Sequence, residues 1–151
     1  MTAFRTHFLR LCPALVAALF VALPAPAAPQ GIPQDTKAIP ETVTPQQISV
    51  LTGGVFRVGE ERLMISGMRA PRVARAQCFY EKRRGRASQR ALKRLLSRGP
   101  IEIFRTGASS VSGVPLVRVV AAGQDVRARM IATGYGRPRG TARSNPWCVR
   151  P

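Results

Sequence analysis

Two arginines lie on either side of one tight corner in the chain. The stretch RLMISGMRAPR alternates like a strand and then ends in an Ala-Pro turn, with Arg69 before the turn and Arg72 after it. A planar guanidinium group donates paired hydrogen bonds to a phosphate, so the two arginines could bind phosphate at this corner. The alternative is that both face only solvent. The candidate polyanion-binding residues are Arg57, Arg62, Arg69 and Arg72.

The cysteines favour a crosslink. Cys78 and Cys148 are the two that remain when Cys12, in an N-terminal segment expected to be removed, is set aside. Two cysteines in an exported chain are expected to pair, and closing so long a loop would contribute about 4 kcal/mol. The single histidine, His7, lies in the same N-terminal segment, so we expect neither a Cys/His nucleophile nor a metal site.

Residues 1–27 have the three parts of a secretory signal peptide: a basic start, a short apolar run and small residues. Ala25 and Ala27 form an A-x-A site, so we expect cleavage after Ala27 and no transmembrane span in the mature chain. The alternative is a retained membrane anchor. Residues 28–47 are rich in Pro and Gln and are predicted to be a linker, with the folded domain at 48–151. The product would be periplasmic in a diderm bacterium, or otherwise secreted.

The chain is strongly basic. It has 24 Lys and Arg against 7 Asp and Glu, a net charge of +17, and losing Arg5 and Arg10 with the signal peptide would leave +15. Such a balance favours nucleic acid, anionic lipid or another acidic partner. All but three of the 24 cations are arginines, a bias that a GC-rich genome would also give, so the charge alone does not identify the partner.

The patterns beyond residue 47 predict a small α+β domain. Strand patterns occupy residues 48–52, 55–59, 62–68, 101–105 and 114–123, and helix patterns occupy residues 75–98 and 126–133. Gly53-Gly54 is a hairpin signal, while Asp125 and Gly134 fit the two caps of the second helix. Three strands, a helix, two strands and a helix predict a five-stranded β-barrel of the OB type, because closure removes exposed sheet edges.

Two features in this order leave alternatives open. The first helix carries many cations, which form either a solvated surface or an anion-binding face. They are Lys82, Arg83, Arg84, Arg86, Arg90, Lys93, Arg94 and Arg98. Trp147, beside Cys148, either packs against the disulfide or stacks on a base.

The span from Val50 to about Cys148 resembles the staphylococcal nuclease (thermonuclease) family. The segment VLTGGVFRVGEERLMISGMRAPR is similar to the family's opening, VxDGDTxRV…GERxRLxGIDAPE. Cys78 and Glu81 resemble its C-x-x-E helix start, and VPLVRVVAAGQDVRARMIATG resembles GRxLARVxxxGxDVxxxLVxxG. The resemblance implies an SNase-like OB-fold. In the family's enzymes it also implies hydrolysis of DNA and RNA with one Ca²⁺.

The same resemblance implies that the groups for hydrolysis have been replaced. The degenerate positions are Gly54, Val55 and Arg69 for the metal ligands, Arg72 for the catalytic glutamate, and Met64 and Val114 for the phosphate-binding arginines. Thr52 stands for the first Asp of DGDT, and Val55 could offer only its carbonyl. Arginines in place of two carboxylates repel Ca²⁺, at about 4 kcal/mol per contact of about 4 Å near a protein surface.

The sequence therefore favours an exported SNase-like protein without catalysis or cofactor, which binds nucleic acid or another polyanion through arginines. One alternative is a Ca²⁺-dependent nuclease with a rearranged site. Another is an envelope protein-interaction domain whose basic surface meets an acidic protein or anionic lipid.

Overall fold

The computed structural model describes residues 39–140 and 145–148, all within a compact unit that begins at Asp35. The predicted signal peptide, its cleavage site at Ala27 and the first part of the predicted linker lie outside the described residues. In the described ranges, no helix is long and apolar enough to cross a membrane. The strands are β1 (Glu41–Val43), β2 (Ile48–Val50), β3 (Val55–Val58), β4 (Glu61–Ile65), β5 (Met68–Arg69), β6 (Ile101–Ser109), β7 (Pro115–Ala121), β8 (Gln124–Asp125) and β9 (Arg137–Pro138). The helices are the 3-10 turn η1 (Pro45–Gln47), α1 (Phe79–Leu96) and α2 (Val126–Ala132).

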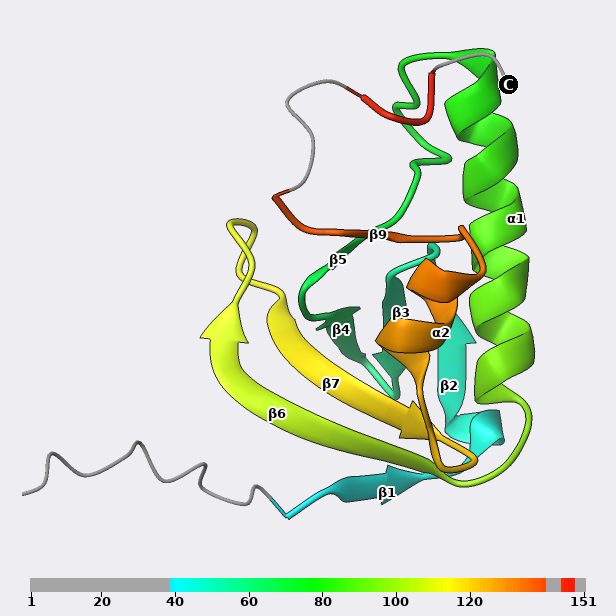
Figure 1. Cartoon of the computed structure of the whole chain (residues 1–151). Coiled ribbons are helices and arrows are strands. Elements are labelled where there is room, and N and C mark those ends of the chain that lie inside the picture. Colours follow the sequence, from blue (N-terminus) through cyan, green and yellow to red (C-terminus); the bar gives the residue numbers. More distant parts are fainter. Residues whose placement is uncertain (1–38, 141–144, 149–151) are drawn as a thin grey trace, which may run out of the picture. The chain divides into compact units, whose positions relative to one another are not determined.

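One mixed sheet holds most of the strands. Its order is β1-β6-β7-β4-β3-β2, with β8 added to β7, and only the β4–β7 pair is parallel. The two outermost strands, β1 and β2, follow one another in the chain with only Thr44 and η1 between them. So short a connection between the two edges requires the sheet to curl, and β6 and β7 are strongly curved (Figure 1). The predicted barrel-like α+β class is therefore confirmed.

The core lies inside this curl. Phe56 of β3 and Leu63 of β4 are register partners and fully buried, as are Ile103 and Val119 in the β6–β7 pair. Leu92 closes the core from α1. Alternate strand residues share one face of a sheet, so the period-2 pattern read from the sequence is the one that fills this core.

Helix α1 begins later than predicted because its N-cap is Cys78. The backbone of Cys78 is extended, and its Sγ accepts a hydrogen bond from the backbone N–H of Glu81 at 3.4 Å. The loop before the helix packs so closely against it that a Cβ on Gly85 would lie 2.5 Å from the carbonyl oxygen of Arg72. Gly85, which costs helix propensity, is therefore needed for this close approach. The predicted N-cap of α2 is confirmed, because the Asp125 side chain accepts from the Ala128 N–H. The C-cap is Thr133, and Gly134, which was predicted for that position, follows it with a φ of 75°.

Several boundaries differ from the prediction. Residues 41–47, assigned to the linker, supply β1 and η1, and Val43 is buried against β6. The predicted third strand breaks at Ser66-Gly67, after which β5 pairs with β9 in a separate two-stranded sheet. Strand β6 runs on to Ser109, so the loop expected from residue 106 is shorter. Strands β1, β5 and β9 have two or three residues each, too few to show a periodic pattern of their own, so the sequence did not indicate them as separate strands.

Candidate functional site

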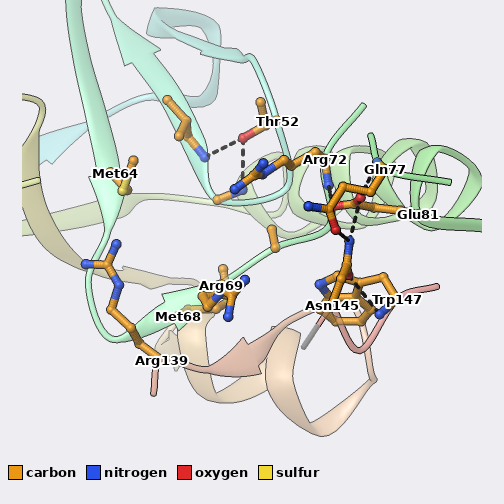
Figure 2. A pocket seen from close by; sticks show the side chains of 13 residues that line it. Thr52, Met64, Met68, Arg69, Arg72, Gln77, Glu81, Arg139, Asn145 and Trp147 are labelled. Atoms are coloured by element: carbon orange, nitrogen blue, oxygen red, sulfur yellow. Dashed lines mark hydrogen bonds between the residues drawn. The ribbon is translucent and has the colours of Figure 1, made fainter. Parts of the chain in front are cut away.

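The two arginines of the Ala-Pro corner face one pocket of about 360 Å³, which we call the Arg69 pocket (Figure 2). Five of the degenerate positions identified in the sequence line it: Gly54, Val55, Met64, Arg69 and Arg72. They come from the β2–β3 loop, β3, β4, β5 and the loop before α1. The curl of the sheet and the short β5–β9 pair bring these separate segments to one place.

The other predicted residues lie elsewhere. Arg57 and Arg62 face each other across the β3–β4 pair and do not line the pocket. Arg57 makes a loose ion pair with Glu60 at 3.9 Å, and Arg62 is exposed. Val114 precedes β7 and is not among the lining residues.

A third arginine in the pocket was missed by the sequence analysis. Arg139 follows β9 and lines the pocket, and its backbone N–H donates to the carbonyl of Gly67 at 3.1 Å. The antiparallel β5–β9 pair, with Arg69 opposite Arg137, places this segment beside the corner. The pairing involves two residues on each side, in a tail without periodicity, so no local signal could have revealed it.

The β2–β3 loop at the edge of the pocket is closed by its own hydrogen bonds. The Thr52 hydroxyl oxygen accepts from the backbone N–H groups of Gly54 and Val55, at 3.3 and 3.1 Å. The Val55 carbonyl accepts from the N–H groups of Leu51 and Thr52, both at 3.0 Å. In the family pattern this position binds the metal through its backbone carbonyl, so the change to valine would not remove that ligand. Here, however, the Val55 carbonyl already accepts two hydrogen bonds within the loop.

Glu81 is the one carboxylate among the described residues that line the pocket, and it is only 2% exposed. Its oxygens accept from the backbone N–H of Gln77 at 2.7 Å, the backbone N–H of Arg72 at 3.2 Å and the side-chain amide of Asn145 at 2.8 Å (Figure 2). Burial raises the pKa of Glu81, but these three donors and the nearby Arg72 charge outweigh it, so the pKa lies below its ordinary value. Glu81 is thus an anion held by neutral donors, and it fastens three segments together.

The predicted disulfide joins the residues that directly follow two lining residues, Gln77 and Trp147. Cys78 and Cys148 are bonded, with their Cα atoms 5.8 Å apart. Trp147 lines the pocket, is 4% exposed, and lies with its ring centroid 5.3 Å from the Arg137 guanidinium carbon. Its backbone N–H donates to the Asn145 side chain at 3.0 Å. Trp147 is therefore buried in the pocket wall, and its two predicted roles, packing against the disulfide and stacking on a base, both stay predictions.

The residues present do not fit a Ca²⁺ ion. A hard divalent cation requires several oxygen ligands, and carboxylates are the usual charged ones. Here three arginines line the pocket, and the oxygens of Glu81 already accept three hydrogen bonds. Over residues 39–140 and 145–148, no group of three or more His, Cys, Asp or Glu side chains comes together in a metal-binding arrangement. The arrangement instead provides fixed positive charge and hydrogen-bond donors, which suit an anion.

Comparison with known proteins assigns no family to the chain. No family model matches it, and no curated protein matches it either.

Proposed function

We propose that residues 41–148 form an OB-type domain of the staphylococcal nuclease kind, which no longer holds a metal and binds phosphate groups of nucleic acid or another polyanion in the Arg69 pocket. The strand order supports the fold part of this proposal. Strands β2, β3 and β4 form an antiparallel meander, and β4 then pairs in parallel with β7, which pairs with β6. Helix α1 lies in the connection between β4 and β6. This order is the one expected for a Greek-key, partly open five-stranded barrel, and it supports the proposed OB-type fold.

The single observation that carries the functional proposal is the lining of the pocket. Five positions singled out by resemblance to a nuclease site gather around one cavity, and three arginines line it. The positions that would carry carboxylates in an enzyme carry Gly54, Arg69 and Arg72. A nuclease pocket changed in this way loses its metal ligands and its base but keeps a strong preference for anions.

Phosphate is the anion that fits best. Guanidinium groups hold phosphate oxygens by paired hydrogen bonds, and a volume of about 360 Å³ lies in the range of small-ligand sites, roughly 300–1,000 Å³. The disulfide supports an exported domain, because such bonds persist in oxidising compartments. The proposed function needs no cofactor.

Trp147 provides the test, since it is the chain's single tryptophan and lies in the pocket wall. Purified protein is titrated with inorganic pyrophosphate, and then with a labelled single-stranded oligonucleotide, in Ca²⁺ and in EDTA, while tryptophan fluorescence is recorded. Gel electrophoresis follows the length of the oligonucleotide over time. We expect saturable binding, no effect of the chelator and intact DNA. Cleavage that EDTA abolishes would overturn the proposal in favour of the nuclease alternative.

Matched variants locate the binding. Arg69→Gln/Arg72→Gln removes two pocket cations, whereas Arg75→Gln/Arg118→Gln removes two exposed cations outside the pocket. We expect pyrophosphate affinity to fall about tenfold or more in the first variant and by less than about threefold in the second. Equal losses would mean that the protein's general charge, and not the pocket, attracts the anion.

A gain-of-function variant tests the resemblance itself. Gly54→Asp/Arg69→Asp restores two carboxylates at the proposed metal positions. A Cβ at position 54 would lie 3.6 Å from the side chains of Ala70 and Met68, which is an ordinary van der Waals contact. We expect this variant to bind Ca²⁺, read as terbium luminescence sensitised by Trp147, while the parent does not. If the folded variant shows no terbium signal, positions 54 and 69 are not the metal positions of the family.

A further inference from the structure

A second concentration of positive charge lies on α1, away from the Arg69 pocket. Six exposed cations share one side of this helix, and we call them the α1 basic face: Lys82, Arg83, Arg86, Arg90, Lys93 and Arg94. At about 100° per residue they fall within roughly 120° of the helix circumference. The opposite side, with Ala91, Leu92 and Leu96, is buried in the core. The six cations therefore form a stripe on the side of α1 opposite its buried face.

These cations have no carboxylate partners in the described part of the chain. The three ion pairs found there involve Arg57 and Arg105, and none involves α1. Six like charges along about 18 Å of helix repel one another, and an external anion would relieve this repulsion. The stripe is thus complementary to an extended anionic partner.

The stripe continues as a track of shallow hollows between the long side chains. One hollow is lined by Phe79, Lys82, Arg83, Arg86 and Arg90. A second is lined by Arg90, Lys93, Arg94 and Ser97, and a third, between α1 and α2, contains Arg94, Arg98, Arg129 and Tyr135. Each hollow shares an arginine with the next, so a ligand could follow the track without leaving the positive surface.

An aromatic ring lies at each end of the track. Phe79 is 73% exposed, although it is a large apolar side chain in the first turn of a helix. Tyr80 supports it edge-to-face, with ring centroids 6.1 Å apart. Tyr135 is half-buried at the other end. A basic track with aromatic rings is the usual construction for binding a single strand, in which cations hold the phosphates and rings stack on bases.

We propose that a single strand of nucleic acid lies along the α1 basic face, with its phosphates on the six cations and a base stacked on Phe79. This inference rests on the proposed function, that the chain binds nucleic acid, and adds a binding surface outside the Arg69 pocket. Successive turns of α1 place cations about 6 Å apart along the axis, a repeat comparable with the separation of neighbouring phosphates in an extended strand. A membrane is a poorer partner, because the apolar side of α1 is committed to the core and cannot enter a bilayer.

The test compares two triple variants of the full mature chain. Arg86→Gln/Arg90→Gln/Lys93→Gln removes the middle of the α1 basic face, and Arg75→Gln/Arg118→Gln/Arg127→Gln removes three exposed cations elsewhere. Binding of a labelled oligonucleotide is measured by fluorescence anisotropy over a range of salt concentrations, after circular dichroism has shown that both variants are folded. For the α1 variant we expect an affinity about tenfold lower and a salt slope smaller by about 2, because three phosphate contacts are lost. For the control we expect a change of less than about threefold.

Each other outcome has a definite meaning. Equal behaviour of the two triple variants would overturn the inference and leave the pocket proposal standing. Pyrophosphate-induced change in Trp147 fluorescence without oligonucleotide binding would do the same. If the parent binds neither ligand, both proposals fail. Binding to vesicles of anionic phospholipid but not to the oligonucleotide would replace the strand by a lipid surface.

The role of Phe79 is tested separately with Phe79→Ala and an abasic strand of the same length. Stacking requires a base, so Phe79→Ala should weaken binding of the normal strand about tenfold and leave binding of the abasic strand unchanged. Phe79→Trp should restore the normal affinity. An equal loss on both strands would show that Phe79 acts only on the structure of the helix start.

Discussion

Arginine has opposite surroundings in two regions of this domain. Arg105, on β6, donates to both oxygens of Glu61 at 2.7 Å and to Glu41 at 3.1 Å, so it ties β1, β4 and β6 together. We call these three residues the Arg105 cluster. In the Arg69 pocket, Arg69, Arg72 and Arg139 make no ion pair with any described residue, although Glu81 lines the same pocket.

The difference indicates which arginines serve the fold. In the Arg105 cluster the chain supplies two carboxylates to one cation, and the hydrogen bond with Arg105 lowers the pKa of Glu61. In the pocket the carboxylate is satisfied by N–H groups instead, which leaves the guanidinium groups available to a ligand. If this division between a structural cluster and a binding pocket holds, substitutions in the two regions should differ in their effects on stability and on binding.

Loss of the disulfide should lower the free energy of unfolding more than any other substitution considered. Cys78→Ser/Cys148→Ser opens a loop with a sequence separation of 70, which should lower the free energy of unfolding by about 4 kcal/mol. Serine can still cap α1, so the loss would reflect the crosslink. Urea denaturation measures the total. Hydrogen exchange should accelerate most at the start of α1 and less in β1 and β6, where only amides that exchange through global unfolding lose protection. Equal acceleration at all sites would contradict a local role.

Glu81→Gln should cause the next largest loss of unfolding free energy. The side-chain NH₂ of the new glutamine would face the backbone N–H groups of Arg72 and Gln77, so a buried donor would lack an acceptor. We expect the free energy of unfolding to fall by about 2–3 kcal/mol. The matched change in the Arg105 cluster, Glu61→Gln, should cost no more than about 1 kcal/mol, because that side chain is 44% exposed. Urea denaturation of both variants gives the comparison. Similar losses would mean that burial does not separate the two carboxylates.

The same two residues predict how stability depends on pH. Each carboxyl has a folded pKa below the ordinary value of 4.5. The stabilisation that each gives is therefore complete above about pH 4.5 and is lost as the pH falls through the lowered folded pKa. Unfolding free energies measured between about pH 6 and about pH 3 should decline in the parent and decline less in Glu81→Gln. A decline of the same steepness in both would exclude Glu81 as a contributor.

Much of this fold could be predicted from the sequence because its signals are local. The alternation around Phe56 and Leu63 and the cap at Asp125 depend on residue types a few positions apart. The pairing of the two cysteines was predicted from their number in a chain expected to be exported. The gathering of Gly54 and Arg69 at one site was also accessible, through resemblance to a family pattern.

The remainder depends on pairings between distant segments. Strand β1 has three residues, of which only Val43 is buried, and therefore shows no alternation. Strands β5 and β9 have two residues each, and their pairing alone brings Arg139 to the pocket. The role of Glu81 was hidden for a related reason: its partner Asn145 lies 64 residues away. Burial of that carboxylate is a property of the folded chain, not of the C-x-x-E pattern.

The smallest expected effects are those of replacing Arg105 or Arg69 alone. Arg105→Gln removes a paired but 46% exposed cation and should lower the free energy of unfolding by up to about 1 kcal/mol. Arg69→Gln removes a cation from beside two others and should leave stability unchanged or raise it slightly, because like charges at the pocket then repel one another less. Pyrophosphate affinity should change in the opposite order, falling in Arg69→Gln and staying constant in Arg105→Gln. Urea denaturation and Trp147 fluorescence measure the two quantities on the same samples. An arginine that is dispensable for folding yet required for binding is expected only where the chain has left its charge for a ligand, so a loss of stability in Arg69→Gln would assign that residue to the fold instead.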